Sequence, residues 1–356
     1  MLVIRDVQRS DLGGLVKLAA LLDTVNLPNE EKTLLQSIDR SVRSFDSRIR
    51  DPFKREYLFV LEDSAKARVV GTSLVIAQHG THDAPHVFFD VYEKEHYSQN
   101  VDKHFKHRVL QIGYNFDGQT EIGGLVVHPD YRRQQKPGKQ LSYVRFLYIA
   151  MHRARFRDRV LVELLPKLED DGRSPLWEAL GSKFTGLSYQ EADRLSRQNK
   201  EFIQQLFPPG EIYATLFSQK IQDAIGVVGP ESAGARSILE RIGFQYDERI
   251  DPFDGGPHWS ARTDKLEPVR RFRKLRLAAE ALPDEAALLA GSPEGARSAS
   301  LEDRLVAVER SAGRNRFRCV RTVCRLQDTQ ILLPREARAA LGARKGDRLC
   351  TIPFED

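Results

Sequence analysis

TEIGGLVVHPDYRRQQKPGKQLSYVRFLYIAM, residues 120–151, contains a strand, a basic loop and a helix in immediate succession. The apolar, β-branched run at 122–127 predicts a buried strand, and His-Pro-Asp at 128–130 predicts a turn. After Gly138, apolar residues recur at three- and four-residue steps, which predicts a helix packed on a sheet. The residues of that apolar stripe are Leu141, Val144, Leu147 and Met151.

A strand, a basic loop and a helix N-terminus together favour an anion-binding site. Unpaired backbone N–H groups and the positive end of the helix dipole converge at such a point. A phosphate ester is therefore the expected ligand. The alternative is an ordinary strand-turn-helix unit with a solvated charge cluster, formed by Arg132, Arg133, Lys136 and Lys139.

The order of these parts, L-x-V-x-P-x-Y-R-R followed by a loop and G-x-x-L, resembles the acyl-CoA binding motif of GNAT-type N-acyltransferases. In that family the loop holds the CoA pyrophosphate. The family's Arg-x-x-Gly-x-Gly/Ala loop has one glycine and one extra residue here. The resemblance implies CoA contacts at Leu125, Val126, Val127, Arg132, Arg133, Gly138, Lys139 and Gln140.

Composition narrows the class of protein. With 356 residues, 41% of them hydrophobic and 29% charged, the chain is long enough for a sizeable core and for more than one domain. No apolar run approaches the roughly 20 residues that span a bilayer. The N-terminal MLVIRDVQRSDL begins with a strand-like run rather than a signal peptide, so a cytoplasmic protein without a membrane partner is expected.

Charge and cysteine content add two expectations. The net charge of +5 comes from dispersed residues, and an anionic cosubstrate explains it, so no nucleic acid partner is expected. Cys319, Cys324 and Cys350 form no C-x-x-C pair and are an odd number, which favours buried structural thiols in a reducing compartment.

The N-terminal half predicts the opening of an α+β fold of the GNAT type. Strand 2–7 is followed by helical patterns that end near Leu22 and Phe45, and then by strands at 57–62 and 69–77. An insertion at 78–115 is rich in histidine and aromatic residues. No histidine pair there shows a metal-ligand spacing, so no metal is predicted; the insertion either contacts the acceptor substrate or is a surface excursion.

The next strand is expected at 159–165, and in a GNAT fold it splays from the strand at 120–127. The thioester would meet the acceptor amine in that wedge. Glu121 and Glu163 lie on these two strands and are candidates to take a proton from an ammonium group or to pair with a cationic substrate. Each is equally compatible with a solvated charge at a strand end.

The C-terminal third predicts a separate module. Residues 262–281 suggest a basic helix, and residues 282–300 suggest a linker rich in alanine, glycine, serine and proline. The final residues predict strands, a helix between Pro334 and Gly342, and a last strand, as in small β-barrels. The expected domains are therefore 1–265, 266–300 for the basic helix and linker, and 301–356.

Several motifs together resemble one family over nearly the whole chain, the arginine N-succinyltransferases. They are Tyr57-Leu-Phe-Val-Leu-Glu-Asp63, His128-Pro-Asp-Tyr-Arg-Arg133, Gly172-Arg-Ser-Pro-Leu-Trp-Glu-Ala-Leu-Gly181, Asn199-Lys-Glu-Phe-Ile203 and Phe253-Asp-Gly-Gly-Pro257. The resemblance implies transfer of a succinyl group from succinyl-CoA to the α-amine of arginine, with no permanently bound cofactor. It also implies a succinyl-CoA contact at Leu125 and assembly with further copies or with a related subunit.

One position departs from the family pattern. The family motif Ile-Gly-x-Val-His-Pro carries a histidine assigned as proton donor, and here the corresponding residue is Gly229. His258, just after the Gly-Gly-Pro turn, is a candidate substitute. The departure leaves two alternatives to succinyl transfer: another acyl-CoA or amine substrate, or a catalytically silent paralogue that binds acyl-CoA.

Overall fold

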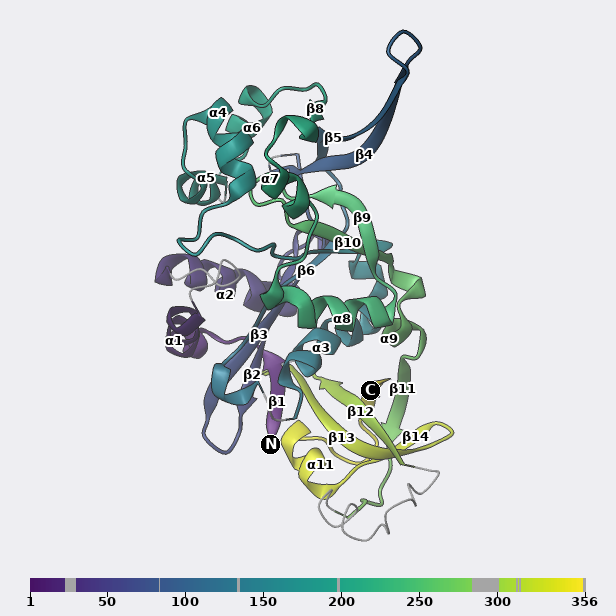
Figure 1. Cartoon of the computed structure of the whole chain (residues 1–356). Coiled ribbons are helices and arrows are strands. Elements are labelled where there is room, and N and C mark those ends of the chain that lie inside the picture. Colours follow the sequence, from purple (N-terminus) through teal and green to yellow (C-terminus); the bar gives the residue numbers. More distant parts are fainter. Residues whose placement is uncertain are drawn as a thin grey trace. The chain divides into compact units, whose positions relative to one another are not determined.

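The computed structural model describes residues 1–22, 30–82, 84–132, 135–196, 199–283, 301–311, 313 and 315–354. The chain forms two compact units, each built from segments far apart in the sequence (Figure 1). Unit 1 contains Met1–Ala77, Ile122–Phe156 and Thr263–Asp356, and unit 2 contains Gln78–Glu121 and Arg157–Arg262. No described helix is both long enough and apolar enough to cross a membrane.

Unit 1 combines a sheet, helices and a barrel. Its first elements are β1 (Leu2–Asp6), α1 (Leu12–Leu22), α2 (Glu31–Phe45), β2 (Glu56–Asp63), β3 (Arg68–Ile76), the greater part of β6 (Thr120–Val127), and α3 (Pro137–Met151). Its last elements are α9 (Glu267–Arg270), β11 (Arg273–Leu277), β12 (Leu301–Glu309), β13 (Phe317–Gln327), β14 (Gln330–Leu332), α11 (Arg335–Leu341) and β15 (Arg348–Pro353).

The expected β-α-α-β-β opening is confirmed, and β6 and α3 form where the sequence predicts them. In the sheet, β1 pairs antiparallel with β2, β2 with β3, and β3 neighbours β6. Helix α3 is buried on most sides rather than along one stripe, because it packs both on the sheet and against barrel strands β12 and β15.

An aromatic cluster fixes α3 within unit 1. The ring centroid of Tyr148 in α3 lies 5.4 Å from that of Phe45 in α2, 4.8 Å from that of Tyr57 in β2 and 5.4 Å from that of Phe317 in β13. Each such pair adds about 0.5–1.5 kcal/mol beyond the area that it buries. The C-terminal half of α3 is therefore held in a defined position relative to the sheet.

Among the described residues, five strands close into a barrel in the order β12-β15-β11-β14-β13, with β12 pairing back to β13. This confirms the β-barrel-like C-terminal module. The barrel's interior is apolar and includes Val306, Val320, Ile331 and Leu349. The expected linker at 282–300 lies almost entirely outside the described residues.

The prediction of a basic helix at 262–281 is wrong. Only a 3-10 turn at Thr263–Lys265 and a short α-helix at Glu267–Arg270 are helical, and Arg273–Leu277 is strand β11, a member of the barrel. Leu275 and Leu277 are buried while Lys274 and Arg276 are exposed, which is the two-residue alternation of a strand. Antiparallel pairing with β15 and parallel pairing with β14 decide the structure of this basic segment.

Unit 2 contains the insertion, the strand after α3 and a group of short helices. Its elements are β4 (His86–Ser98), β5 (Lys103–Asn115), the start of β6, β7 (Arg159–Glu163), a π-helical turn (Trp177–Gly181), α4 (Ser182–Thr185), α5 (Tyr189–Ser196), α6 (Glu201–Leu206), β8 (Ile212–Tyr213), α7 (Gln219–Ala224), α8 (Ala233–Ile242), β9 (Gln245–Ile250) and β10 (Pro257–Arg262).

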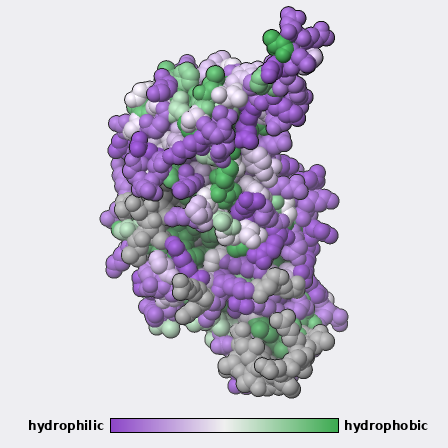
Figure 2. Space-filling model, viewed as in Figure 1, coloured by the Kyte–Doolittle hydropathy of each residue, from purple (hydrophilic) through white to green (hydrophobic). Residues whose placement is uncertain are grey.

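Strands β4 and β5 form a long hairpin whose tip extends beyond the rest of unit 2 (Figure 1). Figure 2 shows this tip as mostly hydrophilic, with a hydrophobic spot. The base of the hairpin joins a sheet in the order β6-β7-β10-β9-β4-β5-β8. Its core is centred on Trp177, whose ring stacks on Phe253 with centroids 5.0 Å apart. This sheet positions the ionisable residues described below.

Candidate active site

The end of β6 and the start of α3 form the first candidate region, in unit 1. Gly124 has φ +55°, a left-handed conformation inside a strand that glycine adopts without strain. Its carbonyl accepts a hydrogen bond of 2.8 Å from Thr72 Oγ1. Leu125 follows and is partly buried, Val126 is buried in the core with α1 and α2, and the carbonyl of Val127 accepts from Arg132 Nε.

The backbone of the loop before α3 is fixed by a hydrogen bond, and the adjoining first turn of the helix is accessible on one side. Gln135 and Lys136 have φ +57° and +53°, and the Gln135 carbonyl accepts a 2.7 Å hydrogen bond from Gln140 Nε2. A side chain added at Gly138 would meet nothing within 4 Å, so the first turn of α3 is approachable there. Arg132 is exposed, and Arg133 lies outside the described residues. These features fit a phosphate at the helix N-terminus.

Two other expected contact residues are engaged within unit 1. Lys139 is buried, with Nζ 5.0 Å and 4.7 Å from the ring centroids of Tyr143 and Phe354. Gln140 is also buried, and its side chain braces the loop as described. These contacts hold the start of α3, whereas Arg132 and Gly138 lie on its accessible side.

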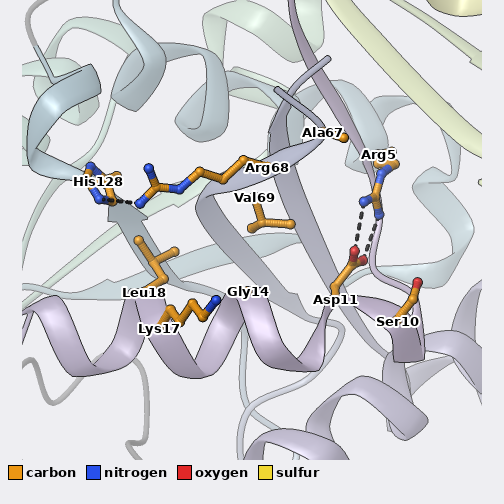
Figure 3. Close-up of a pocket in the computed structure, with 10 residues that line it drawn as sticks. All are labelled: Arg5, Ser10, Asp11, Gly14, Lys17, Leu18, Ala67, Arg68, Val69 and His128. Carbon is orange, nitrogen blue, oxygen red and sulfur yellow. Dashed lines mark hydrogen bonds and ion pairs between the residues drawn. The ribbon is translucent and has the colours of Figure 1, made fainter. Parts of the chain in front are cut away.

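A cavity of about 280 Å³ lies nearby in unit 1, between α1, β3 and His128 (Figure 3). Arg68 Nη2 lies 2.8 Å from His128 Nε2. Arg5 points to Asp11 and donates two hydrogen bonds of 2.7 and 2.8 Å to its carboxylate. The charge of Arg5 is therefore compensated within the protein, while Lys17 and Arg68 are exposed cations.

The second candidate region lies in unit 2, where strand register brings three predicted residues to one face. Glu163 of β7 is directly opposite His258 of β10. Glu121 of β6 is opposite Leu161, two residues before Glu163. Opposed residues, and residues two apart on a strand, share a face of the sheet. Glu121, Glu163 and His258 therefore meet, although they are far apart in sequence.

Two further histidines complete a cluster of five ionisable residues, which we call the His-Glu cluster: His79, His86, Glu121, Glu163 and His258. His86 Nε2 and His258 Nε2 lie 3.2 and 3.5 Å from Glu163 Oε1. His79 Nδ1 pairs with Glu121 Oε2. The rings of His86 and His258 stack with centroids 5.1 Å apart, and the ring of His79 is 4.4 Å from that of His86.

The turn that carries His79 and His86 requires a glycine. Gly80 has φ +82°, and a side chain there would meet the Asn115 carbonyl at 2.3 Å and the His86 nitrogen at 3.0 Å. The turn is also held by a 2.8 Å hydrogen bond from His79 N to the Gln119 carbonyl. The base of the β4–β5 hairpin thus fixes both imidazoles against β6 and β7.

Burial and neighbouring charges divide the cluster into charged and neutral groups. Burial opposes protonation of His79, but the charge and hydrogen bond of Glu121 together with the charge of Glu163 outweigh it and raise the pKa of His79. Burial, together with charge at His79, lowers the pKa of His86 to about 3, and burial lowers the pKa of His258. Although burial opposes ionisation of Glu163, the surrounding imidazoles hold its pKa well below its usual value.

Two partly buried carboxyl groups follow β9. Burial and the charge of Glu163 raise the pKa of Asp251 to about 7, and burial and Asp251 raise that of Asp254 well above its usual value. Asp251 Oδ1 accepts a 2.6 Å hydrogen bond from Phe253 N, and Asp254 Oδ1 accepts one of 2.7 Å from Gly256 N. These bonds shape the turn that leads into His258.

Gly229 is packed directly against backbone. Its N–H donates to the Leu165 carbonyl at 2.9 Å, and a Cβ at this position would lie 2.6 Å from the Pro166 carbonyl carbon. In this backbone no side chain fits at position 229. The close packing of unit 2 around position 229 thus requires the glycine that departs from the family motif.

The sequence placed Glu121 and Glu163 together on two neighbouring strands and indicated His258 separately, and it gave no specific role to His79 or His86. The signal for Glu121 and Glu163 was their position on neighbouring strands. For His258 it would have been its pairing with Glu163, which requires the register of two strands almost a hundred residues apart. No spacing in the sequence marks the two remaining histidines.

The order β1-α1-α2-β2-β3, then β6-α3-β7, with a glycine in the first turn of α3, defines an acyl-CoA N-acyltransferase of the GNAT type. Proteins of this class take an acyl group from a coenzyme A thioester.

Comparisons with known proteins specify the family. A family model described as arginine N-succinyltransferase beta subunit matches residues 2–268. The arginine N-succinyltransferase of Yersinia pseudotuberculosis serotype IB is 33% identical over 350 residues, which cover 98% of this chain and 96% of that protein. That of Enterobacter sp. (strain 638) is 34% identical over 281 residues, which cover 78% and 81%.

A solved structure agrees with this assignment. Arginine/ornithine succinyltransferase subunit AI from Pseudomonas aeruginosa matches with a TM-score of 0.81 and 28% sequence identity, covering 100% of this chain and 99% of that one. The chain belongs to the arginine N-succinyltransferase family. The expected family and the GNAT-like fold are both confirmed.

Proposed function

We propose that this chain transfers the succinyl group of succinyl-CoA to the α-amine of arginine. Family membership supports the two substrates, since relatives along nearly the full length of the chain carry this activity in their names. The observation that carries the chemistry is the His-Glu cluster, which places an ionised carboxylate among neutral imidazoles on the strand that follows α3.

The reaction needs a proton acceptor. The α-ammonium of arginine must lose a proton before its nitrogen attacks the thioester carbonyl; the C–S bond then breaks, and the thiolate of CoA takes up a proton. The products are N-succinylarginine, free CoA thiol and one released proton. Because a thiolate is a good leaving group near neutral pH, the amine is the group with the greater need for acid-base help.

Glu163 is our proposed contact for the acceptor ammonium. Its side chain keeps 30% of its surface exposed, while His86 and His258 behind it are almost fully buried. As an anion, Glu163 attracts the ammonium group and is placed to take the proton that leaves. In this scheme the cluster accepts a proton, which differs from the proton-donor role that the family motif gives to the position of Gly229.

Glu121 takes a positioning role in the same scheme. Its carboxylate holds His79 by the ring nitrogen Nδ1, and His79 in turn packs against His86. This pairing orients the imidazoles rather than contacting the acceptor.

In unit 1, we place the CoA diphosphate at the start of α3. Arg132 and Gly138 are the accessible groups, and Arg133 would add a second cation. Lys139 and Gln140 support the loop through the contacts described above. Leu125, Val126 and Val127 carry the strand edge along which the acyl arm would lie. Assembly into a homo-oligomer or with a related subunit remains a prediction.

The decisive assay follows free thiol from succinyl-CoA with and without arginine. Release that requires arginine supports the proposal. Release only with another acyl-CoA or amine would redirect it to a different substrate pair. Binding of succinyl-CoA without release under any condition would contradict it and identify a silent paralogue.

A further inference from the structure

We propose that the His-Glu cluster binds one divalent transition-metal ion, for which Zn²⁺ is the natural probe. The inference rests on the geometry of unit 2 alone, and because Glu163 would ligate the ion, a bound ion and the acceptor ammonium would compete for that carboxylate.

The first argument is the convergence of donor atoms. One ligand atom from each of His79, His86 and Glu163 lies within 4.8 Å of the other two, and the same is true of Glu163, Asp251 and His258. Glu163 belongs to both sets. Imidazole nitrogens combined with carboxylate oxygens are the donor types that zinc and its neighbours in the first transition series prefer.

The second argument is a set of buried ring nitrogens that lack a hydrogen-bond partner or contact the same carboxylate oxygen. Among the described residues, His79 Nε2 and His258 Nδ1 are buried and make no hydrogen bond, whereas the buried His86 Nε2 and His258 Nε2 lie 3.2 and 3.5 Å from Glu163 Oε1. His258 is 0% exposed and His86 is 2% exposed. A buried polar atom without a partner costs about 1–3 kcal/mol, so such atoms are rare in native proteins unless an ion, water or ligand satisfies them.

The third argument is the support around one donor. Glu121 contacts His79 at Nδ1, which leaves the buried Nε2 of the same ring available as a donor. A carboxylate on the far nitrogen of a histidine is the usual arrangement for a metal ligand, because it fixes the tautomer and orients the ring. The protein therefore provides both a donor and its orienting partner.

These observations assign the roles. His79, His86 and Glu163 are the primary ligands, and His258 is the nearest further donor, since its Nε2 lies 3.5 Å from the same Glu163 oxygen. One carboxylate with several imidazoles is a donor set that suits a divalent ion, and the ion would give the buried His79 Nε2 a partner.

Isothermal titration of Zn²⁺ into tag-free, chelator-treated protein tests the site. We expect one ion per chain, with a rise in melting temperature because the ion binds only the folded state. His86→Ala should abolish binding. Glu121→Gln, which removes only the orienting group, should weaken binding by about 10–100-fold. His104→Ala is the matched control: His104 is exposed on the hairpin, paired with Glu95, and should leave binding unchanged.

Melting curves without metal show whether each variant is folded. If wild-type protein binds less than one ion in ten chains, or if folded His86→Ala binds zinc as well as the wild type, the inference is overturned. Binding that is lost equally in His104→Ala would also contradict it, since it would place the ion on surface histidines. Because none of these readouts requires turnover, they are separate from any failure of the transferase assay.

Discussion

At the scale of single residues, Glu163 is the group on which the proposed chemistry depends. Glu163→Gln keeps the shape of the side chain but removes its charge. We expect kcat to fall by about 10²–10⁴-fold, the range for loss of an acid-base group. Steady-state thiol release at saturating succinyl-CoA measures this effect. A variant within twofold of the wild type would remove Glu163 from the mechanism; Glu178→Gln, on the π-helical turn, is a control.

Gly229 provides a second residue-level test. A methyl group at this position would collide with the Pro166 backbone, so Gly229→Ala should destabilise the protein by about 1–3 kcal/mol. Gly229→His, which restores the family residue, should cost more. Gly210→Ala is the matched control, because nothing lies within 4 Å of the added atom. Urea unfolding followed by tryptophan fluorescence distinguishes the variants, and equal midpoints for Gly229→Ala and Gly210→Ala would contradict the packing argument.

The contribution of Asp251 to the free energy of unfolding depends on pH. Its pKa is raised to about 7, above the value near 4 of an unfolded chain. The folded state therefore favours the protonated carboxyl, and this contribution is present below about pH 4 and lost as the pH rises to about 7. Asp251→Asn should gain stability relative to the wild type across that interval. The prediction would be wrong if the stability difference between Asp251→Asn and the wild type stayed constant with pH. It would also be wrong if the exposed Asp170→Asn variant showed the same change.

His86 acts in the opposite direction. Its pKa is lowered to about 3, so its contribution is present above about pH 6.5 and lost as the pH falls toward 3. The pH profile of the wild type is the sum of both effects, which is why the Asp251 comparison uses a difference between two proteins.

At the scale of elements, β11 shows how neighbours decide structure. Leu275 is buried in the barrel opposite Leu349, and Lys274 beside it is exposed. Leu275→Ala should cost about 2–5 kcal/mol, whereas Lys274→Ala should stay within about 0.5 kcal/mol. Chemical unfolding of unit 1, followed by reaction of its cysteine thiols, measures the difference. Similar costs at both positions would favour a helix over a strand.

The same comparison explains what the sequence could predict. The strand at 120–127 and helix α3 were predicted because their apolar periodicities are long and distinct. The segment at 262–281 was misassigned because its many arginines and lysines obscured a two-residue alternation of only five residues, and its pairing partners lie more than fifty residues away. Local pattern therefore predicted elements with long repeats and missed one that depends on distant partners.

The candidate site was predictable in part for the same reason. Glu121 and Glu163 could be placed on neighbouring strands from periodicity alone. The opposition of His258 to Glu163, and the turn that brings His79 and His86 beside them, depend on register and on Gly80. Neither feature has a sequence spacing that distinguishes it.

At the scale of the whole molecule, the two units carry different natural reporters. Both tryptophans, Trp177 and Trp259, belong to unit 2, and the three cysteines belong to unit 1. Burial raises the pKa of Cys324 to about 12 and that of Cys350 to about 11, and it also raises that of Cys319. The native protein should therefore contribute little background when CoA thiol is measured.

These reporters allow a prediction about cooperativity. Each unit has its own apolar core, so Gly229→Ala in unit 2 should lower the urea midpoint seen by tryptophan more than that seen by thiol reactivity. Equal shifts with both probes would instead indicate one cooperative transition. The comparison needs no labels and uses the full chain.

The pairing of β1 with β13 has a consequence for biosynthesis. Ile4 pairs in register with Cys319, which lies more than three hundred residues later in the sequence. During synthesis, β1 therefore has no partner on this side until β13 has been made. Until that partner emerges, one edge of the nascent sheet stays exposed to other chains, and such edges promote aggregation. Slow translation or a shortage of chaperones should therefore reduce the yield of this protein before any defect appears in the finished molecule.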